Sequence, residues 1–585
     1  MTTGEKLQLL REKMKERSLD AYYIPTADPH MSEYLPEQYK TRRFMSGFTG
    51  SAGTLLVLPD EAFLWTDGRY FIQAEKELAG STITLCKMGM PQVPTVVEFF
   101  EKRFAKGGRL GVDGKVLSAA WFKVFKEKVP KLEFVTDIDL VGEIWTDRPA
   151  PVASKAFTLD TKYCGETAES KINRLRKLLA EKEVNTTIIS ALDEVCYLFN
   201  IRASDVHCNP VLTSYALIDG ERACLFVNQK QIPAGVRKDL EKQGVSIFDY
   251  EEIFSEAEKI VRSVYLDPNT TNLYLFKKLK VKVIEGDGLV IGMKACKNEI
   301  EIKNIRNTMI TDGVALTKFL YWLSKNAASG ISETDTVKKL RAFRKQGEGF
   351  IDDSFDTIAG YAENGAIVHY APVEGADKKL APKSFLLLDS GGHYYSGTTD
   401  ITRTIPLGDL TADECRDYTL VLKSHINLAR AKFKKGTTGF ALDTLARVPF
   451  WAEGKDYNHG TGHGVGFVLA VHEGPQSISQ RYIKAPLEAG MLTSNEPGLY
   501  IEGKYGIRIE SLVLTKELTE TEFGTFYEFE TLTLCPISTK PVVKEMLSVE
   551  ELAWLNAYNA QCYDTLAPHL SDEEKKFLEN ECKGI

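Results

Sequence analysis

The sequence predicts an α/β protein in which two related N-terminal domains precede a third, C-terminal α/β domain. Three observations support this prediction. The chain has 585 residues, more than a single hydrophobic core usually serves. Helix-like and strand-like patterns follow one another along it. Residues 10–28 also align without gaps with residues 175–193, which indicates an internal repeat.

The repeat relates two segments at a constant offset of 165 residues, "LREKMKERSLDAYYIPTAD" and "LRKLLAEKEVNTTIISALD". Each segment predicts an amphipathic helix followed by a short strand. Further along, "TLLVLPDEAFLW" and "YALIDGERACLFV" each predict two strands joined by a turn. Any two helix–strand units share some likeness, so this alternative stays open, but we expect two related domains in series.

The domain boundaries follow from breaks in these patterns. Two prolines and several small residues interrupt the periodicity in "WTDRPAPVASKAF", and near residue 298 a charged segment leads into a long helical pattern. We therefore expect domains at 1–155, 156–297 and 298–585. In the third we expect the strands "SFLLLD", "TTDITRTI", "MLTSNEPGLY" and "GIRIESLVL", and a helical tail after residue 547.

Composition limits the function. The net charge of −8 gives no basic field, so we expect no binding to nucleic acid or to an anionic membrane surface. No apolar run approaches the length that spans a bilayer, and the charged N-terminus lacks the apolar segment of a signal peptide. The ten cysteines include no C-x-x-C pair, which favours reduced thiols. We expect a cytoplasmic protein.

Acidic side chains occur where the sequence predicts buried strands: Asp389, Asp400, Glu496 and Glu510. Asp389 ends an apolar run, and the turn after it returns through Asp400, so both should lie near the same end of neighbouring strands. Arg508 shares a strand face with Glu510 and is expected to support a ligand carboxylate. A lone acid of this kind is more often a turn or edge charge.

Four buried carboxylates are costly unless cations neutralise them. Two divalent ions would balance the charge, and His463 would add a neutral nitrogen ligand. Such an oxygen-rich set favours manganese, with cobalt, iron or zinc as alternatives. His463 lies in "YNHGTGHGVGFVLAVHEGP", which holds three of the nine histidines. We expect its glycines to let the backbone approach metal and substrate closely.

In their order and surroundings, the four acids and His463 resemble the five ligands of the pita-bread dinuclear metallopeptidases. These five residues are Asp389, Asp400, His463, Glu496 and Glu510. The motifs "NGAIVHYAP", "HGTGHGVGFVLAVHEGP" and "NEPGLYIEGKYGIRIES" resemble those of Xaa-Pro aminopeptidases. The segments "SGFTGSAGTLLV", "TDGRYFIQA" and "ALDEVCYLFNIRASDVHCNPV" resemble the long, three-domain cytosolic form. The resemblance covers nearly the whole chain. It implies two creatinase-like α/β domains followed by a pita-bread catalytic domain.

The resemblance also implies roles for individual residues. Asp389, Asp400 and Glu510 would hold one metal, and Asp400, His463, Glu496 and Glu510 the other. The implied catalytic residues are His369, His459, His472 and Glu496, and the implied substrate-binding residues are Arg69, His369 and His472. The substrate would be a peptide with proline at its second position. A homodimer is implied as well, with Trp451 in the subunit contact.

Other functions remain open from the sequence. A prolidase would cleave only X-Pro dipeptides, and a methionine aminopeptidase would have no evident use for two further N-terminal domains. A non-catalytic pita-bread binding protein is a third alternative, although such proteins typically lose metal ligands and this chain retains all five.

Overall fold

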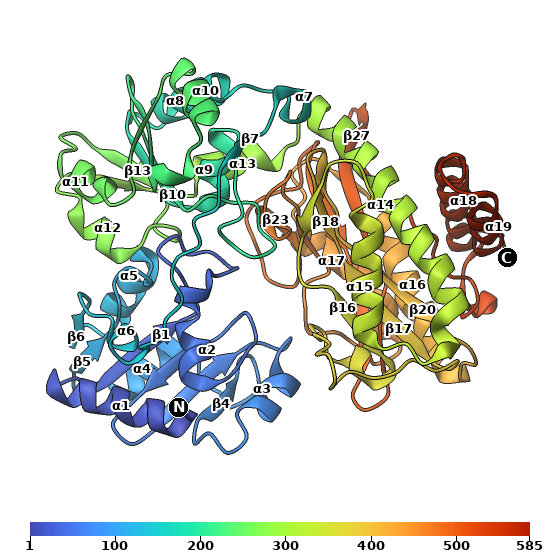
Figure 1. The fold of residues 1–585 in the computed structure, drawn as a ribbon, viewed down its shortest axis with the longest axis horizontal. Helices are drawn as coiled ribbons and strands as arrows, with labels where there is room; N and C mark the ends of the chain where they lie inside the picture. The colour runs from blue at the N-terminus through green and yellow to red at the C-terminus, as the bar shows by residue number, and fades with distance from the viewer. The chain divides into compact units, whose positions relative to one another are not determined.

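The computed structural model describes residues 1–585. It divides into two compact units (Figure 1). The first unit comprises Met1–Leu159 and Glu166–Val290, and the second comprises Asp160–Gly165 and Ile291–Ile585. None of the helices combines the length and the apolar character needed to cross a lipid bilayer.

The first half of the first unit is a six-stranded sheet flanked by helices. Its strands are β1 (Ala21–Pro25), β2 (Thr54–Val57), β3 (Ala62–Thr66), β4 (Thr84–Lys87), β5 (Gly108–Gly111) and β6 (Leu132–Val135), in the order β4-β3-β2-β1-β5-β6. Its helices are α1 (Thr3–Glu16), α2 (Thr41–Ser46), α3 (Phe71–Glu77), α4 (Val96–Arg103), α5 (Ala119–Lys128) and α6 (Leu140–Ile144). Successive residues of β1 pack into different hydrophobic clusters, so both sheet faces are covered.

The second half has the same architecture. Its strands are β8 (Thr187–Ile189), β10 (Ser214–Ile218), β11 (Ala223–Val227), β12 (Val245–Asp249), β13 (Val264–Leu266) and β14 (Val283–Glu285), in the order β12-β11-β10-β8-β13-β14. Its helices are α8 (Ala168–Glu181), α9 (Leu192–Leu198), α10 (Ala234–Lys242), α11 (Glu252–Glu258) and α12 (Leu273–Lys278). The short strands β7 (Phe157–Thr158) and β9 (Ile201–Arg202) form a separate pair.

The predicted internal repeat is confirmed by this topology. Helices α1 and α8 each have 14 residues and begin 165 positions apart. Counting outwards from β1 and from β8, the two sheets have the same sequence of antiparallel and parallel neighbours. Both expected hairpins are present, as β2–β3 and as β10–β11.

A buried histidine ties the two halves of the first unit together. The Nδ1 atom of His30 lies 2.7 Å from the Ser190 carbonyl oxygen, and its Nε2 atom lies 2.8 Å from the Tyr250 hydroxyl. Burial lowers the pKa of His30. The imidazole is therefore a neutral hydrogen-bonding group inside the unit.

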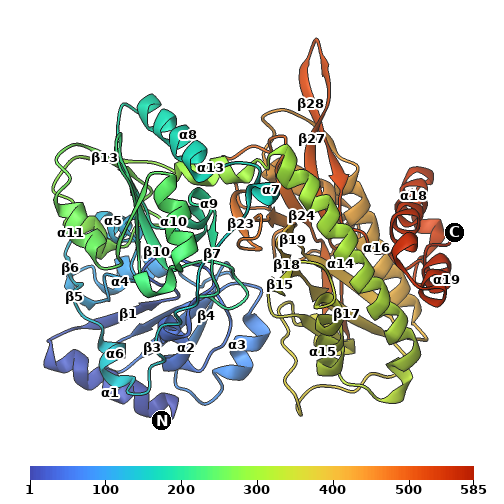
Figure 2. The same ribbon diagram turned by 45° about the horizontal axis from the view of Figure 1, so that its top comes forward.

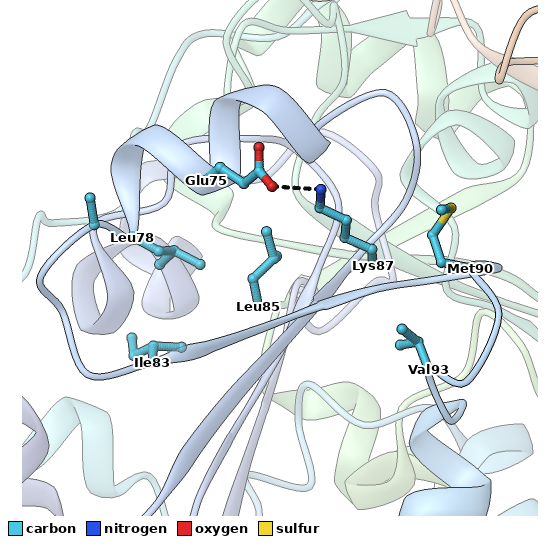
Figure 3. Close-up of a pocket in the computed structure, with 8 residues that line it drawn as sticks. Glu75, Leu78, Ile83, Leu85, Lys87, Met90 and Val93 are labelled. Carbon is cyan, nitrogen blue, oxygen red and sulfur yellow. Dashed lines mark ion pairs between the residues drawn. The ribbon is translucent and has the colours of Figure 1, made fainter.

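A pocket of about 390 Å³ opens beside α3 and β4 in the first unit (Figure 3). Its wall is mostly apolar, with Leu78, Ile83 and Leu85 among the lining residues. Across it, Lys87 Nζ lies 2.6 Å from Glu75 Oε1. None of the residues predicted for chemistry lines this pocket.

The second unit contains the long helix α14 (Glu299–Asn326), α15 (Glu333–Arg344), α16 (Ala412–Ala429), α17 (Gly439–Ala452), α18 (Val549–Leu566), α19 (Asp572–Glu581) and the short α7 (Thr161–Cys164). Helix α13 (Leu289–Ala295) lies where the chain passes from one unit to the other. Asn298 caps α14 in a capping box with Glu301, which explains why the charged segment before residue 298 leads into a helix. The predicted helical tail is confirmed as α18 and α19.

The strands of the second unit form several small sheets and one larger sheet. The small sheets are β16-β17-β20, β15-β18-β19 and β25-β26, and the larger sheet has the order β21-β28-β27-β24-β22-β23. The strands are β15 (Phe350–Asp353), β16 (Ile358–Tyr361), β17 (Phe385–Ser390), β18 (Gly392–Tyr394), β19 (Gly397–Thr398), β20 (Ile401–Pro406), β21 (Lys432–Lys434), β22 (Gly462–Gly464), β23 (Glu473–Ile478), β24 (Leu492–Asn495), β25 (Gly498–Ile501), β26 (Tyr505–Arg508), β27 (Ser511–Thr521) and β28 (Gly524–Thr531). The β27–β28 hairpin extends beyond the rest of this unit (Figure 2).

Three of the four predicted strands are divided between sheets. The stretch "MLTSNEPGLY" forms β24 and β25, and "TTDITRTI" begins in β19 and continues as β20. The stretch "GIRIESLVL" was expected to be a single strand, but β26 ends at Arg508 and β27 begins at Ser511, in a different sheet. Between them the Glu510 N–H donates to the Thr402 carbonyl at 3.0 Å, so the backbone bends toward β20. The bend places Glu510 at the junction of the β25-β26 sheet and the larger sheet. The boundaries at residues 155 and 297 stay predictions.

Candidate metal centre

The first two candidate ligands lie at one end of the β17–β20 pair. The strands are antiparallel, and Asp389 of β17 faces Thr402 of β20 in register. Asp400 directly precedes β20, so the expectation that both acids lie near the same end of neighbouring strands is confirmed. The connection is longer than a simple turn because it forms β18 and β19, which pair with each other.

Two further candidate ligands come from the segments around β24 and β27. Glu496 directly follows β24, and its N–H donates to the Thr461 carbonyl at 2.8 Å. Glu510 lies at the bend before β27, where its Oε2 accepts a hydrogen bond from the Thr402 hydroxyl at 2.8 Å. Chain segments about 100 residues apart thus supply neighbouring carboxylates.

His463 lies on β22 between two glycines that the fold requires. A Cβ on Gly462 would lie 1.9 Å from the Ser494 carbonyl oxygen, and a Cβ on Gly464 would lie 2.2 Å from the Glu473 carbonyl oxygen. These two glycines therefore let the backbone pack against neighbouring strands. The expectation that they also let it approach metal and substrate stays a prediction. The Nδ1 atom of His463 lies 3.0 Å from the Gly464 carbonyl oxygen. An N–H donated there leaves the Nε2 lone pair available for a metal.

The ligand atoms converge. Candidate ligand atoms of Asp400, His463 and Glu510 all lie within 4.8 Å of one another. The His463 Nε2 atom lies 3.4 Å from Asp400 Oδ2 and 3.4 Å from Glu496 Oε1. Asp389 adds to the same negative field, since its charge raises the pKa of Asp400. The structure thus brings all five predicted ligands together.

Burial and mutual repulsion disfavour the ionised form of three of the carboxylates, Asp400, Glu496 and Glu510. Asp389, Asp400 and Glu510 are 7%, 4% and 1% exposed. Burial, followed by the charges of neighbouring acids, raises the pKa of Asp400 and of Glu510 well above the ordinary range. Burial also raises the pKa of Glu496 to about 7. In the absence of other cations, the cluster would hold protons at neutral pH.

These residues fit a pair of divalent ions. The Oδ1 atom of Asp389 is buried and has no hydrogen-bond partner, as expected of an oxygen that serves as a metal ligand. The Arg508 guanidinium supplies one positive charge to the four acids, because it lies 2.6 Å from Asp389 Oδ2. Carboxylate oxygens with one imidazole nitrogen are a donor set for hard or borderline divalent ions.

Several residues that are not candidate metal ligands form hydrogen bonds that hold the site together. Arg508 Nη1 donates to the Tyr500 hydroxyl at 2.7 Å, and this hydroxyl lies 2.9 Å from His459 Nε2. The Thr402 hydroxyl donates a hydrogen bond to Glu510. Arg508 was predicted from the sequence, whereas Tyr500 and Thr402 were not. The one available signal was their position within the motifs "NEPGLY" and "TTDITRTI".

The remaining predicted residues lie at different distances from this centre. The His472 ring centroid lies 4.2 Å from that of His463. His459 is joined to Arg508 through Tyr500. His369 lies in the segment between β16 and β17, after the 3₁₀ turn Ala362–Ala366. Arg69 belongs to the first unit, where it forms a two-point ion pair with Asp67 at 2.8 Å, and its contact with peptide stays a prediction.

Comparison with known proteins identifies the family. Residues 303–517 match the metallopeptidase family M24, and residues 525–585 match the C-terminal region of peptidase M24. Residues 6–145 and 147–301 each match a creatinase/prolidase N-terminal domain. Both matches to N-terminal domains agree with the repeat seen in the fold.

Full-length relatives agree with these matches. Aminopeptidase P2 of Arabidopsis thaliana is 40% identical over 97% of this chain and 87% of its own length. A probable Xaa-Pro aminopeptidase P of Laccaria bicolor is 39% identical over 100% of this chain and 94% of its own.

A solved structure is similar over the whole chain. The crystal structure of X-prolyl aminopeptidase from Caenorhabditis elegans, a cytosolic enzyme with a dinuclear active site, has a TM-score of 0.95 and 38% identity, and covers 100% of both chains. The fold class predicted from the sequence is confirmed. The chain belongs to metallopeptidase family M24, as a member of its Xaa-Pro aminopeptidase P group with two creatinase/prolidase N-terminal domains and a pita-bread domain.

Proposed function

We propose that this protein is a dinuclear-metal aminopeptidase that hydrolyses the bond between an N-terminal residue and a penultimate proline. The observation that carries the proposal is the convergence of Asp400, His463 and Glu510 within 4.8 Å, beside Asp389 and Glu496. It occurs in a chain whose full length is similar to that of an X-prolyl aminopeptidase with a dinuclear site.

The five clustered side chains would hold the metals. Asp389, Asp400 and Glu510 are assigned to one ion, and Asp400, His463, Glu496 and Glu510 to the other. Manganese is the first choice because the donors are mostly carboxylate oxygens, and cobalt, iron and zinc are alternatives. When bound, two divalent ions lower the pKa of a water molecule and polarise the scissile carbonyl.

The protein side chains move protons and orient the peptide. The Glu496 carboxylate accepts a proton from the attacking water and returns it to the proline nitrogen as the bond breaks. His369 and His472 donate hydrogen bonds to the carbonyl oxygen as negative charge develops there. His459, held by Tyr500, contributes a third imidazole, and Arg69 contacts the peptide.

Proline restricts how the substrate is recognised. Its nitrogen carries no hydrogen, so the site cannot select for that donor. Recognition must use the shape of the ring and the trans geometry of the X–Pro bond.

Hydrolysis of X-Pro-Z peptides by metal-stripped protein, with manganese, cobalt and zinc added back in turn, tests the activity and the metal together. Restoration by at least one ion is expected. Arg-Pro-Pro and Arg-Pro are compared in the same assay, and turnover of the dipeptide alone would favour a prolidase. Absence of a bound divalent ion together with absence of chelator-sensitive hydrolysis would favour a binding protein.

A second copy of the chain is the proposed partner, docked on α17. Phe440, Val448 and Trp451 share one side of this helix and are 47%, 51% and 46% exposed, and nearby Tyr482 is 63% exposed. Contiguous exposed apolar side chains of this kind mark an interaction surface. A twofold homodimer would bury them. We place the enzyme in the cytoplasm, as described for the Caenorhabditis elegans protein.

A further inference from the structure

A buried carboxylate outside the metal cluster organises the segment that carries His369. Glu333 is the first residue of α15 and its exposed fraction is 0%. Its Oε1 atom accepts hydrogen bonds from the Tyr361 N–H at 2.7 Å and from Asn364 Nδ2 at 2.9 Å. Its Oε2 atom accepts from the Tyr370 hydroxyl at 2.8 Å and from the Lys378 N–H at 3.0 Å.

The donors lie on both sides of His369 in the sequence. Residues 361 and 364 precede it, Tyr370 follows it directly, and Lys378 closes the segment. Apart from a 3₁₀ turn, the chain from residue 362 to 384 forms no helix or strand. Its backbone pairing with the start of α15 is confined to residues 378–380, where Lys379 bridges Ser332. Nearer His369, the Glu333 carboxylate supplies the anchor instead of a strand ladder.

The opposite side of the segment packs against the strand that leads to the metal cluster. A Cβ on Gly506 of β26 would lie 1.8 Å from the Gly365 carbonyl oxygen, so the two backbones are in direct contact. Arg508, on the same strand, donates to the Val368 carbonyl at 3.5 Å and to Asp389 at 2.6 Å. Residues 361–378 are thus held between Glu333 and the strand that binds Asp389.

We propose that Glu333 is a positioning residue that fixes the backbone around His369, so that this histidine meets the scissile carbonyl of the peptide. The inference rests on the proposed function, because it takes the role of His369 from it. Hydrogen bonds to an ionised oxygen are stronger than those between neutral groups, so four donor groups on one carboxylate are an effective anchor. An apolar side chain at position 333 would leave those donors without their partner.

Glu333→Gln in the metal-loaded, full-length enzyme tests the proposal. The amide keeps the size of the side chain but turns one acceptor into a donor that faces other donors. We expect kcat/KM for an X-Pro-Z peptide to fall about 10-fold to 100-fold, mainly through kcat, at unchanged metal content. Asp335→Asn is the matched control, since Asp335 is an exposed carboxylate in the first turn of the same helix and bonds only within its capping box.

A double-mutant cycle separates positioning from a general structural effect. In a His369→Ala background, Glu333→Gln should lower kcat/KM by less than 3-fold, because the group that it positions is gone. Equal losses in both backgrounds, or a Glu333→Gln enzyme with wild-type kcat/KM, would overturn the proposal. A wild-type enzyme without activity on X-Pro-Z would instead contradict the proposed function.

Tyr370→Phe provides a second variant in case Glu333→Gln does not fold. It removes one of the hydrogen bonds to Glu333, so a smaller loss of about 3-fold to 10-fold is expected, and this loss should also vanish in the His369→Ala background. Unchanged kcat/KM in Tyr370→Phe, or a loss that persists without His369, would count against Glu333 as the anchor.

Discussion

The Arg508 guanidinium lies 2.6 Å from Asp389 Oδ2 and 2.7 Å from the Tyr500 hydroxyl, so one cation orients a candidate metal ligand and an active-site hydrogen-bond partner. Its Nε atom donates to the Thr402 hydroxyl at 3.1 Å, and Thr402 in turn donates to Glu510. Arg508 therefore contacts Asp389 directly and is connected to Glu510 through Thr402. The geometry uses the planar, multi-donor character of arginine, which lysine lacks.

We therefore predict that Arg508→Lys lowers metal affinity by about 10-fold to 100-fold, the range for residues that orient metal ligands. A single ammonium cannot hold Asp389, Tyr500 and Thr402 together. Isothermal titration calorimetry with a divalent metal measures the change in affinity. Arg306→Lys is the control, since Arg306 forms an exposed two-point pair with Glu530 and should have little effect. Equal affinities for wild type and Arg508→Lys would contradict the prediction.

The pH dependence of stability should reveal the neutralisation of the acids. The raised pKa values of Asp400, Glu510 and Glu496, the last about 7, mean that the metal-free folded state binds more protons than the unfolded state. Metal-free protein should then lose stability as pH rises through the folded pKa values. Divalent ions replace those protons, so their stabilising effect should grow with pH.

The measurement is the difference in Tm between metal-loaded and chelated protein from pH 6.5 to 8. Histidines that titrate in the same way in metal-loaded and in chelated protein contribute equally to both Tm values, so their contribution cancels in the difference. Glu496→Gln should reduce its slope, because one titrating carboxylate is removed. A difference in Tm that is constant, or that shrinks as pH rises, would contradict the prediction.

Much of the fold followed from local patterns in the sequence. The helix–strand repeat was visible because α1 and α8 have equal length and each is followed by a short strand. The acids stood out because a charge is unexpected in an apolar run such as "SFLLLD". Both signals depend on residues that are close together in the chain.

What could not be predicted depends on contacts between distant segments. The bend at Glu510 arises from pairing with Thr402, 108 positions earlier, and no local preference indicates it. Glu333 likewise looks like an ordinary acid in the first turn of a helix, where acids are common. Only the return of residues 361–378 onto α15 reveals its role. Tyr500 was missed for the same reason, since its partner His459 lies 41 positions earlier, in the loop between α17 and β22.

A buried neutral histidine predicts a loss of stability in acid. His425 has 0% exposure, and its Nδ1 atom lies 3.1 Å from the Asn495 carbonyl oxygen. Burial lowers its pKa to about 3. Because the unfolded state takes up a proton below about pH 6.5 while the folded state does not, stability contributed by this site falls as pH drops from 6.5 toward 3.

His425→Gln keeps a donor for the Asn495 carbonyl and removes the titration. The variant should therefore show a shallower fall of the free energy of unfolding between pH 6.5 and 5, by up to about 1.4 kcal/mol per pH unit. Urea unfolding at several pH values measures this slope. His569→Gln, at an exposed position, should leave the slope unchanged. An identical slope for His425→Gln and wild type would contradict the assignment of a neutral buried imidazole.

The apolar side of α17 predicts the oligomeric state. Trp451→Glu places a charge where the proposed dimer would exclude water, so the variant should be monomeric at concentrations where wild type is dimeric. Trp121→Glu is a matched control, because Trp121 is also 46% exposed but lies on α5 of the first unit. Light scattering coupled to gel filtration measures the mass of each variant.

A second substitution at Trp451 separates the apolar ring from its indole hydrogen bond. Trp451 Nε1 donates to Asp456 Oδ2 at 3.0 Å, and Asp456 accepts from Arg447 at 2.6 Å. Arg447 Nη2 donates to the His459 carbonyl at 2.7 Å, so the exposed indole is three side-chain contacts from a candidate catalytic histidine. Trp451→Phe keeps an apolar ring but removes the indole N–H. It should stay dimeric and lose less than 3-fold in kcat/KM, since the exposed hydrogen bond contributes about 1 kcal/mol or less. A dimeric Trp451→Glu would show that α17 is not the subunit contact.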